Sequence, residues 1–298
     1  MKLHYSQEVQ KALNEKRPIL ALESTIITHG LPRPRNLTLA TELETMAREQ
    51  GVTPATIAVF EGCLKVGLSS EELTMLAQRT EDCFKFSSFD LPVAQGLKLT
   101  GSTTVAGTCH IAHKAGLKVF ATGGIGGVHQ AESSRMDISH DIKALSENPL
   151  VVVSSGAKCI LDLESTLEHL ETLGVPLVGW QTNEFPAFYY NDSGLKISHK
   201  VTKVNEIANI AKHLKKSALL VANPVPLKDQ LPKEYVKKII SEAHKKAKEE
   251  GISGKKITPY LLDFLCKRSK EKTLETNCSL IRNNVKLACK IAKSFSSF

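Results

Sequence analysis

The chain has 298 residues, 42% of them hydrophobic, and a formal net charge of +8 at neutral pH. This length can bury a substantial core, and no apolar run is long enough to span a membrane. Seven cysteines without a Cys-x-x-Cys pair argue against both a disulfide framework and a zinc ribbon. Because the N-terminus also lacks an apolar signal region, a cytoplasmic protein without a membrane partner is expected.

Short apolar runs alternate with stretches of helical period along the chain. The apolar runs predict strands over 19–22, 56–60, 117–121, 150–154, 177–180 and 219–222. The helical periods predict helices over 37–50, 70–78, 104–114, 137–146, 160–173, 204–215, 232–251 and 274–293. Such alternation predicts an α/β protein whose mostly parallel sheet carries helices on both faces. No repeat or linker divides the chain, so residues 1–298 are expected to form one domain.

The first predicted strand ends at Leu22, and Glu23, Ser24 and Thr25 follow it. A carboxyl group that is half removed from water at such a position has a raised pKa and can act as a general acid. The alternative is a carboxylate that pairs with a nearby lysine or arginine. The stretch alone leaves both interpretations open.

Residues 99–108, Leu-Thr-Gly-Ser-Thr-Thr-Val-Ala-Gly-Thr, lead into the helix that carries His110 and His113. Hydroxyl groups and small residues at a helix N-terminus can bind an anion such as phosphate. Ser102 or Thr103 could equally serve as an ordinary N-cap. Capping and phosphate binding use the same atoms, so the sequence leaves this choice open too.

The segment Thr122-Gly-Gly-Ile-Gly-Gly-Val-His129 directly follows a predicted strand. It does not match a dinucleotide-binding loop, because His129 stands where the third glycine belongs and no helix is predicted to start there. NAD is therefore not expected. Four glycines still mark a place where backbone approaches something closely, and His129 is a candidate to point into that space.

In Asp137-Ile-Ser-His-Asp141, Asp137 is predicted to cap a helix, with Asp141 one turn later on the same side. One or two carboxylates with few other ligands suit Mg²⁺ or Mn²⁺ that retains several waters. A cap followed by an acid in the first turn, which favours the helix dipole, explains the pattern without a metal.

The most apolar run of the chain, Leu150-Val-Val-Val-Ser154, leads through Ser-Gly-Ala to Lys158. The three valines predict a strand buried on both faces, and open α/β sheets bind ligands beyond the carboxyl ends of their strands. A lysine amine partly removed from water loses its charge more readily and can form a Schiff base with a sugar carbon. The alternative is a surface lysine that opens the next helix.

The C-terminal part of the chain is strongly basic: residues 211–298 hold 20 lysines and arginines against 8 acidic residues. The lysines punctuate the helix predicted over 232–251, and no aromatic residues alternate with them as nucleic-acid stacking would require. A solvated helix face is therefore expected rather than a nucleic-acid partner. A basic surface still favours a phosphorylated small substrate.

Asn277 is placed at or near the start of the last predicted helix, and Asn283 and Asn284 follow it. The asparagine amide offers a donor and an acceptor, which complements the edge of a uracil-type base. A capping role for Asn277 is the alternative.

Taken together and in this order, these segments resemble the pseudouridine-5′-phosphate glycosidase family. The resemblance rests on Ala21-Leu-Glu-Ser-Thr-Ile-Ile27, Gly101-Ser-Thr-Thr-Val105, Phe120-Ala-Thr-Gly-Gly-Ile-Gly-Gly-Val-His129, Asp137-Ile-Ser139, Ser155-Gly-Ala-Lys158 and the Asn277 segment. It extends to Pro54-Ala-Thr-Ile57, Gln181-Thr182, Phe185-Pro-Ala-Phe188 and Val221-Ala-Asn-Pro224, from about residue 7 to the C-terminus.

The resemblance implies an α/β/α sandwich, assembled as a homotrimer, that converts pseudouridine 5′-phosphate and water to uracil and ribose 5-phosphate. It implies that Lys158 is the nucleophile, Glu23 the proton donor, and Asp137 the ligand of a divalent cation, Mn²⁺ by preference. Asn277 would read the uracil, and Asp141 would position Lys158 or relay its proton. The remaining residues implied to bind substrate are Lys85, Thr104, Val105, Thr122, His129, Ser139 and His140.

The chain departs from the family pattern near the implied site. Gln130, His140 and Cys159 replace residues that are common in the family, and the surroundings of Lys85 lack the usual arginines. These departures put substrate affinity in question more than the reaction. Two other functions remain open: a Schiff-base lyase or aldolase acting on another sugar phosphate, and a nucleotide-binding protein without catalysis.

Overall fold

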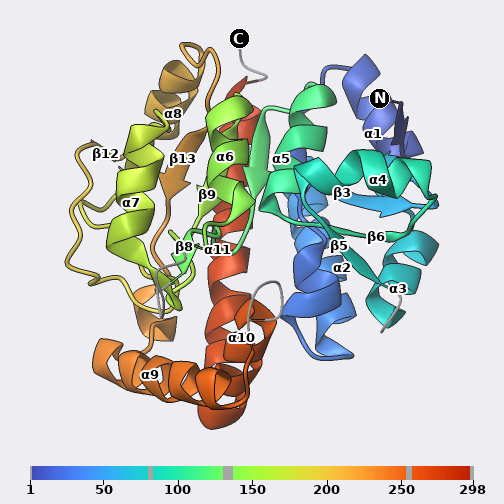
Figure 1. Ribbon diagram of the computed structural model, residues 1–298. Helices are drawn as coiled ribbons and strands as arrows, with labels where there is room; N and C mark the ends of the chain where they lie inside the picture. Colours follow the sequence, from blue (N-terminus) through green and yellow to red (C-terminus); the bar gives the residue numbers. More distant parts are fainter. Residues whose placement is uncertain (1, 80–82, 130–136, 253–256, 296–298) are drawn as a thin grey trace.

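A computed structural model describes residues 2–79, 83–129, 137–252 and 257–295 (Figure 1). Within these residues an eleven-stranded sheet forms the centre, in the order β1-β4-β3-β2-β7-β9-β13-β11-β12, with β6 paired to β3 and β5 to β6. Its strands are β1 Leu3–Tyr5, β2 Ile19–Leu22, β3 Thr53–Phe60, β4 Cys63–Val66, β5 Phe84–Phe86, β6 Gly101–Thr103, β7 Val119–Ala121, β9 Val151–Ser154, β11 Leu177–Trp180, β12 Lys200–Val201 and β13 Leu219–Ala222. A separate antiparallel pair joins β8 (Val128–His129) to β10 (Leu161–Asp162).

The strands from β3 through β2, β7, β9, β13 and β11 to β12 are all parallel. Every residue of β2, β9 and β13 is buried, as expected for strands covered by helices on both faces. The antiparallel neighbours β4 and β6 extend the sheet beside β3. Because the central strands are parallel, the residues that follow β2, β7, β9 and β13 meet at one edge.

Helices cover both faces of the sheet (Figure 1). On one face α5 packs against α6, and α6 against α7; on the other, the long helix α11 contacts β2, β7 and β9 and lies between α2 and α8. Helices α9 and α10 pack together beyond the sheet, beside the first half of α11. The helices are α1 Gln7–Asn14, α2 Arg35–Glu49, α3 Ser70–Gln78, α4 Leu91–Gly96, α5 Val105–Lys114, α6 His140–Glu147, α7 Leu163–Thr172, α8 Val204–Ala211, α9 Lys233–Glu249, α10 Ile257–Arg268 and α11 Lys272–Phe295, with short turns η1 Ile26–Gly30, η2 Ser88–Asp90 and η3 Leu227–Asp229.

The mostly parallel α/β/α sandwich predicted from the alternation of strands and helices is confirmed. The basic helix α9 buries its apolar side chains and exposes its lysines, which is the solvated face that was expected. None of the described helices is both long enough and apolar enough to cross a lipid bilayer. The assignment of residues 1–298 to one domain stays a prediction.

Most predicted helix starts lie within two residues of the observed ones, but two were placed three residues too early. The helix expected from Asp137 begins at His140, because the Ser139 hydroxyl, not Asp137, accepts the hydrogen bond that caps α6. The helix expected from Ile160 begins at Leu163, because Leu161 and Asp162 first pair with β8.

Candidate active site

Glu23, Thr122 and Lys158 follow three neighbouring strands, β2, β7 and β9, at the edge where open α/β sheets bind ligands. Three adjoining cavities open there, and Lys85 lines all of them. The inner chamber, of about 60 Å³, is lined by Asn277 and Phe188 among others. The middle chamber, of about 80 Å³, adjoins it, and Glu23 and Lys158 line both. The outer chamber has about 420 Å³. Together they form the candidate active site, and we call them the active-site cleft.

Glu23 lies partly buried between the inner and middle chambers. Burial raises the pKa of its carboxyl group, while the nearby charge of Lys158 and the hydrogen bond donated by the Thr122 hydroxyl lower it. The net shift is upward, so the protonated acid persists to higher pH than in water. The direction of this shift agrees with the one expected for Glu23 from the sequence, and the hydrogen-bond partner of its carboxyl group is the Thr122 hydroxyl. Its role as a general acid stays a prediction.

Lys158 is held on a loop that continues the parallel pairing of β7 and β9. The N–H of Ser155 donates to Gly123 O at 2.9 Å, the N–H of Ile125 to Gly156 O at 3.1 Å, and the N–H of Lys158 to Ile125 O at 3.1 Å. Ile125 and Ala157 form a parallel bridge. The glycine segment thus serves close backbone approach, as predicted, and the segment that it approaches is the loop that carries Lys158.

Asp141 holds two segments of the cleft together. Its side chain is 6% exposed, and its two oxygens accept the N–H of Ala106 at 2.9 Å and the N–H of Gly126 at 2.8 Å. The first of these N–H groups belongs to the first turn of α5 and the second to the glycine segment. These two contacts make Asp141 a brace of the middle chamber, which it also lines.

The N-terminus of α5 faces the middle and outer chambers. Thr104 caps the helix, its hydroxyl accepting the N–H of Gly107 at 3.3 Å, and both Thr104 and Val105 line the middle chamber. The alternative that Ser102 or Thr103 caps this helix was wrong, because these residues belong to strand β6. Helical N–H groups that face a cavity suit a phosphate.

The residues lining the outer chamber include seven that the sequence analysis took from four separate segments: Lys85, Thr104, His129, Asp137, Ser139, His140 and Asp141. Burial lowers the pKa of His129, and the charges of Lys158 and Lys85 lower it further, although Asp137 opposes them. A neutral imidazole is therefore favoured. Its Nδ1 atom is buried without a hydrogen-bond partner among the described residues.

Asp137 is an exposed residue at the rim of the outer chamber. Within the described residues, no group of three or more histidine, cysteine, aspartate or glutamate side chains is arranged to hold a metal ion. One carboxylate at a polar rim fits Mg²⁺ or Mn²⁺, which retain several waters and take ligands from a substrate phosphate. It does not fit zinc, which needs several protein ligands.

Asn277 lines the inner chamber from α11. The helix begins at Lys272, so Asn277 lies in its second turn and is not a cap. Its side chain is 8% exposed, and its Oδ1 atom has no hydrogen-bond partner among the described residues. Such a buried acceptor next to Phe188 suits an N–H of a flat heterocycle.

Sequence reasoning assigned no role to Phe188, Thr258 or Asn284. Phe188 lines the inner chamber with a backbone φ of 61°, rare for a residue with a side chain, and Thr258 reaches His129 Nε2 at 3.4 Å from α10. Asn284 is fully buried on the apolar face of α11, a position where a polar residue is a signal in itself. Gln130, named above as a departure, lies outside the described residues.

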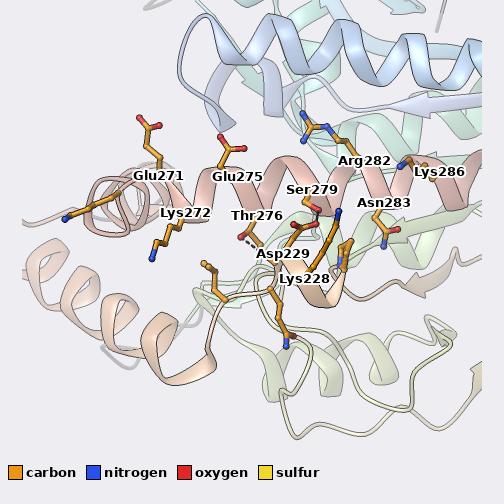
Figure 2. Close-up of a pocket in the computed structure, with 14 residues that line it drawn as sticks. Lys228, Asp229, Glu271, Lys272, Glu275, Thr276, Ser279, Arg282, Asn283 and Lys286 are labelled. Carbon is orange, nitrogen blue, oxygen red and sulfur yellow. Dashed lines mark hydrogen bonds between the residues drawn. The ribbon is translucent and has the colours of Figure 1, made fainter.

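A cavity of about 690 Å³, larger than any of these chambers, lies elsewhere, between η3 and α11 (Figure 2). Figure 2 shows Asp229 turned toward Thr276 and Ser279, and the Ser279 hydroxyl donates to its carboxylate at 2.6 Å. Arg282 donates to both oxygens of Glu42, at 2.6 and 2.7 Å. We call this cavity the α11 groove.

Over almost its whole length the chain is similar to curated proteins named pseudouridine-5′-phosphate glycosidase. The relative from Saccharopolyspora erythraea is 48% identical over 295 residues, which cover 98% of this chain and 97% of that protein. The relative from Staphylococcus aureus is 46% identical, covering 97% and 95%. The chain belongs to the pseudouridine-5′-phosphate glycosidase family. Residues 8–294 also match the family model described as Indigoidine synthase A like protein.

Two solved structures share the fold of this glycosidase family member. An indigoidine synthase A-like protein from Thermotoga maritima has a TM-score of 0.87 and 35% identity, covering 94% of each chain. The prealnumycin C-glycosynthase AlnA, solved in complex with ribulose 5-phosphate, has a TM-score of 0.90 and 33% identity, covering 99% of this chain and 97% of AlnA. The resemblance noted from the sequence is thereby confirmed at the level of family and fold.

Proposed function

We propose that this chain is a C-glycosidase that reversibly cleaves pseudouridine 5′-phosphate to uracil and ribose 5-phosphate, in pseudouridine breakdown. The observation that carries the proposal is the junction of the inner and middle chambers, where Glu23, with its raised pKa, and Lys158 line the same space. A general acid beside an amine is the pair needed to break a bond to carbon, since a carbon leaving group must receive a proton. The names of the relatives support the same substrate.

The proposed reaction uses Lys158 as nucleophile. With its lone pair free, the amine attaches to C1′ as the C1′–O4′ bond breaks, and O4′ takes up the proton that the newly bonded nitrogen releases. The nitrogen lone pair then expels the base: the C1′–C5 electrons pass to uracil C5, which receives the proton of Glu23, and an imine to Lys158 remains. Water hydrolyses this Schiff base to the aldehyde of ribose 5-phosphate and regenerates the amine.

The three chambers offer a place for each part of the substrate. We assign the uracil to the inner chamber, where the unpaired Oδ1 of Asn277 accepts an N–H of the base. The ribose then lies in the middle chamber between Glu23 and Lys158. The phosphate extends to the N-terminus of α5 and the outer chamber, where its proposed ligands are Lys85, Thr104, Val105, His129, Ser139 and His140.

Three further assignments belong to the proposal. Asp137 would hold Mn²⁺, or another divalent cation, at the rim of the outer chamber, where the ion would neutralise phosphate charge. A homotrimer is supported by exposed apolar side chains along one segment: Phe84, Phe89, Val93 and Leu97. A cytoplasmic location is supported by the seven cysteines, all of them free thiols.

The test is an absorbance assay for uracil release from pseudouridine 5′-phosphate, with and without Mn²⁺. We expect the parent enzyme to turn over and Lys158→Ala to lose all turnover while keeping its circular dichroism spectrum. Borohydride should trap ribose 5-phosphate on Lys158, adding the mass of the reduced sugar to the peptide that contains it. Uracil release by Lys158→Ala at the parent rate would contradict the mechanism.

Two outcomes would favour the alternatives. Trapping at Lys158 without uracil release, combined with cleavage of another sugar phosphate in a substrate panel, would indicate an aldolase or lyase. Binding of pseudouridine 5′-phosphate without turnover, with metal or without, would indicate a nucleotide-binding protein. The reverse reaction, from uracil and ribose 5-phosphate, should be run in parallel because the similar AlnA structure is that of a C-glycosynthase.

A further inference from the structure

A single side chain joins the ends of three central strands. Asn284, on α11, is 0% exposed. Its amide nitrogen donates to Thr122 O, just past β7, at 2.8 Å, and lies 3.2 Å from the Ser155 hydroxyl, just past β9. Its Oδ1 atom accepts the Nδ2–H of Asn223, just past β13, at 2.9 Å.

The orientation of this amide follows from chemistry. A backbone carbonyl can only accept a hydrogen bond, so the Asn284 atom that faces Thr122 O, and also Gly123 O at 3.3 Å, must be the nitrogen. The oxygen then faces Asn223. Both the nitrogen and the oxygen of the buried amide thus have hydrogen-bond partners among the residues that follow the strands. Such partners offset the free-energy cost of removing a polar group from water.

The two segments that Asn284 joins carry the reacting groups. The Thr122 hydroxyl donates to the Glu23 carboxylate. Ser155 begins the loop that ends at Lys158, and its own N–H bonds to Gly123 O at 2.9 Å. Asn284 therefore contacts Thr122, the hydrogen-bond partner of Glu23, on one side and Ser155, the first residue of the Lys158 loop, on the other.

Asn284 also fixes α11 to the sheet next to the inner chamber. Asn277 stands seven residues earlier, two turns along the same helix face. A shift of α11 relative to the strand ends would displace Asn277 as well. One buried amide thus sets the position of three groups that must meet the same substrate.

We propose that Asn284 is a positioning residue of the reaction, which fixes the Thr122–Glu23 unit, the Lys158 loop and the Asn277 helix relative to one another. The inference rests on the proposed function for its assay. It differs from a role in stability alone, because it requires that a folded variant without this amide bind substrate but fail to align the acid with the nucleophile. Misplacement by about 1 Å can cost on the order of 100-fold in rate.

The decisive variant is Asn284→Asp, which keeps the shape but faces Thr122 O with an acceptor instead of a donor. We expect kcat to fall about 10- to 100-fold with KM changed far less. Without the Asn284 donor, Thr122 should shift, and its hydroxyl should lose the hydrogen bond to Glu23. Because that bond lowers the pKa of Glu23, its loss should move the alkaline limb of the kcat profile to higher pH. The yield of ribose 5-phosphate trapped on Lys158 by borohydride should fall in parallel.

The matched control is Asn283→Ala, the adjacent residue, whose side chain donates to Pro224 O at 3.1 Å and lines the α11 groove instead of the cleft. It should keep the parent kcat and pH profile. If Asn284→Asp does not fold, Asn223→Ala decides, since it removes only the donor that orients the Asn284 oxygen; a smaller fall in kcat with the same pH shift supports the inference.

The inference is overturned if Asn284→Asp folds and keeps both the parent kcat and the parent alkaline limb. If Asn284→Asp does not fold, the inference is overturned when Asn223→Ala keeps both of these properties. Failure of the proposed function looks different: the parent itself would release no uracil. In that event the yield of ribose 5-phosphate trapped on Lys158 can still be compared between the parent and Asn284→Asp, since trapping needs only ribose 5-phosphate and borohydride.

Discussion

The active-site cleft and the α11 groove differ both in volume and in how far their polar side chains are already paired. The groove is the larger cavity, about 690 Å³, yet its arginine, serine and threonine side chains are bonded to one another or to neighbouring residues. The inner and middle chambers measure only about 60 and 80 Å³. The cleft, however, contains buried polar atoms, His129 Nδ1 and Asn277 Oδ1, that have no partner among the described residues.

Unpaired buried polar atoms therefore distinguish the two regions better than size. A buried acceptor without a donor costs free energy, and a ligand that supplies the donor recovers it. Among the described residues that line the α11 groove, none has such an unpaired buried atom. Its lysines are solvated charges, which bind small anions weakly and without selectivity.

The sharpest test of the comparison is Glu23→Gln. We expect kcat to fall about 100- to 10,000-fold, the usual contribution of a positioned general acid. Because the pKa of Glu23 is raised, parent activity should decline as pH rises through that pKa, and this alkaline limb should vanish in the variant. A pH–rate profile of both proteins measures this; an identical limb in the variant would assign the limb to another group.

Stability offers a second measurement on the same variant. A carboxyl group whose folded-state pKa is raised stabilises the fold below its unfolded pKa, and this contribution is lost as pH rises through the folded pKa. The melting temperature of Glu23→Gln minus that of the parent should therefore increase between pH 4 and pH 8. A constant difference would mean that the pKa of Glu23 is not raised in the folded protein.

Gly126→Ala should have the next largest effect. An added methyl group would lie 2.7 Å from Asp141 Oδ2 and would also contact the Ser139 hydroxyl, so the brace between α5 and the glycine segment would open. We expect about 1–3 kcal/mol of destabilisation and a fall in kcat. Gly96→Ala is the control, because no described heavy atom lies within 4 Å of its added methyl group. Equal melting temperatures for the two variants would contradict the role of Asp141.

Asn277→Ala should weaken binding more than it slows chemistry. Loss of one hydrogen bond to the base, about 1.4 kcal/mol, corresponds to about a tenfold rise in KM. Inhibition by free uracil should weaken by the same factor, which separates base recognition from any effect on the sugar. Unchanged uracil inhibition would place the base outside the inner chamber.

The smallest effect is expected in the α11 groove. Lys228→Ala and Lys272→Ala, singly or together, should leave kcat and KM within about twofold, because surface substitutions away from a site cost less than about 0.5 kcal/mol. A larger change in steady-state kinetics would break the distinction between the two regions and give the groove a function.

Local sequence patterns predicted several strands that are apolar throughout and one helix, α3, that has a capping box. β2, β11, β13 and α3 match their predicted bounds, since each is a clear apolar run or, in α3, has a capping box between Ser69 and Glu72. Short polar strands such as β6, Gly101–Thr103, were missed, because their hydroxyl groups look like a loop until their partners are known.

The residues of the site were predictable as single groups, but their mutual support was not. Thr122 and Glu23 are 99 positions apart, and Asn284 and Thr122 are 162 apart. No local pattern encodes such contacts. Asp141 was placed beside Lys158 through the family resemblance, whereas the structure has its two oxygens on backbone N–H groups of α5 and the glycine segment.

The backbone pairing that runs past β7 and β9 has a consequence for how the proposed nucleophile behaves between turnovers. Since Ile125 bonds to both Gly156 and Lys158, the amine is carried by what amounts to an extension of the sheet. Its main chain has little conformational entropy to lose when a sugar arrives. Amide deuterium uptake at Ile125 and Lys158 should accordingly be as slow as in the central strands, with or without a bound nucleotide.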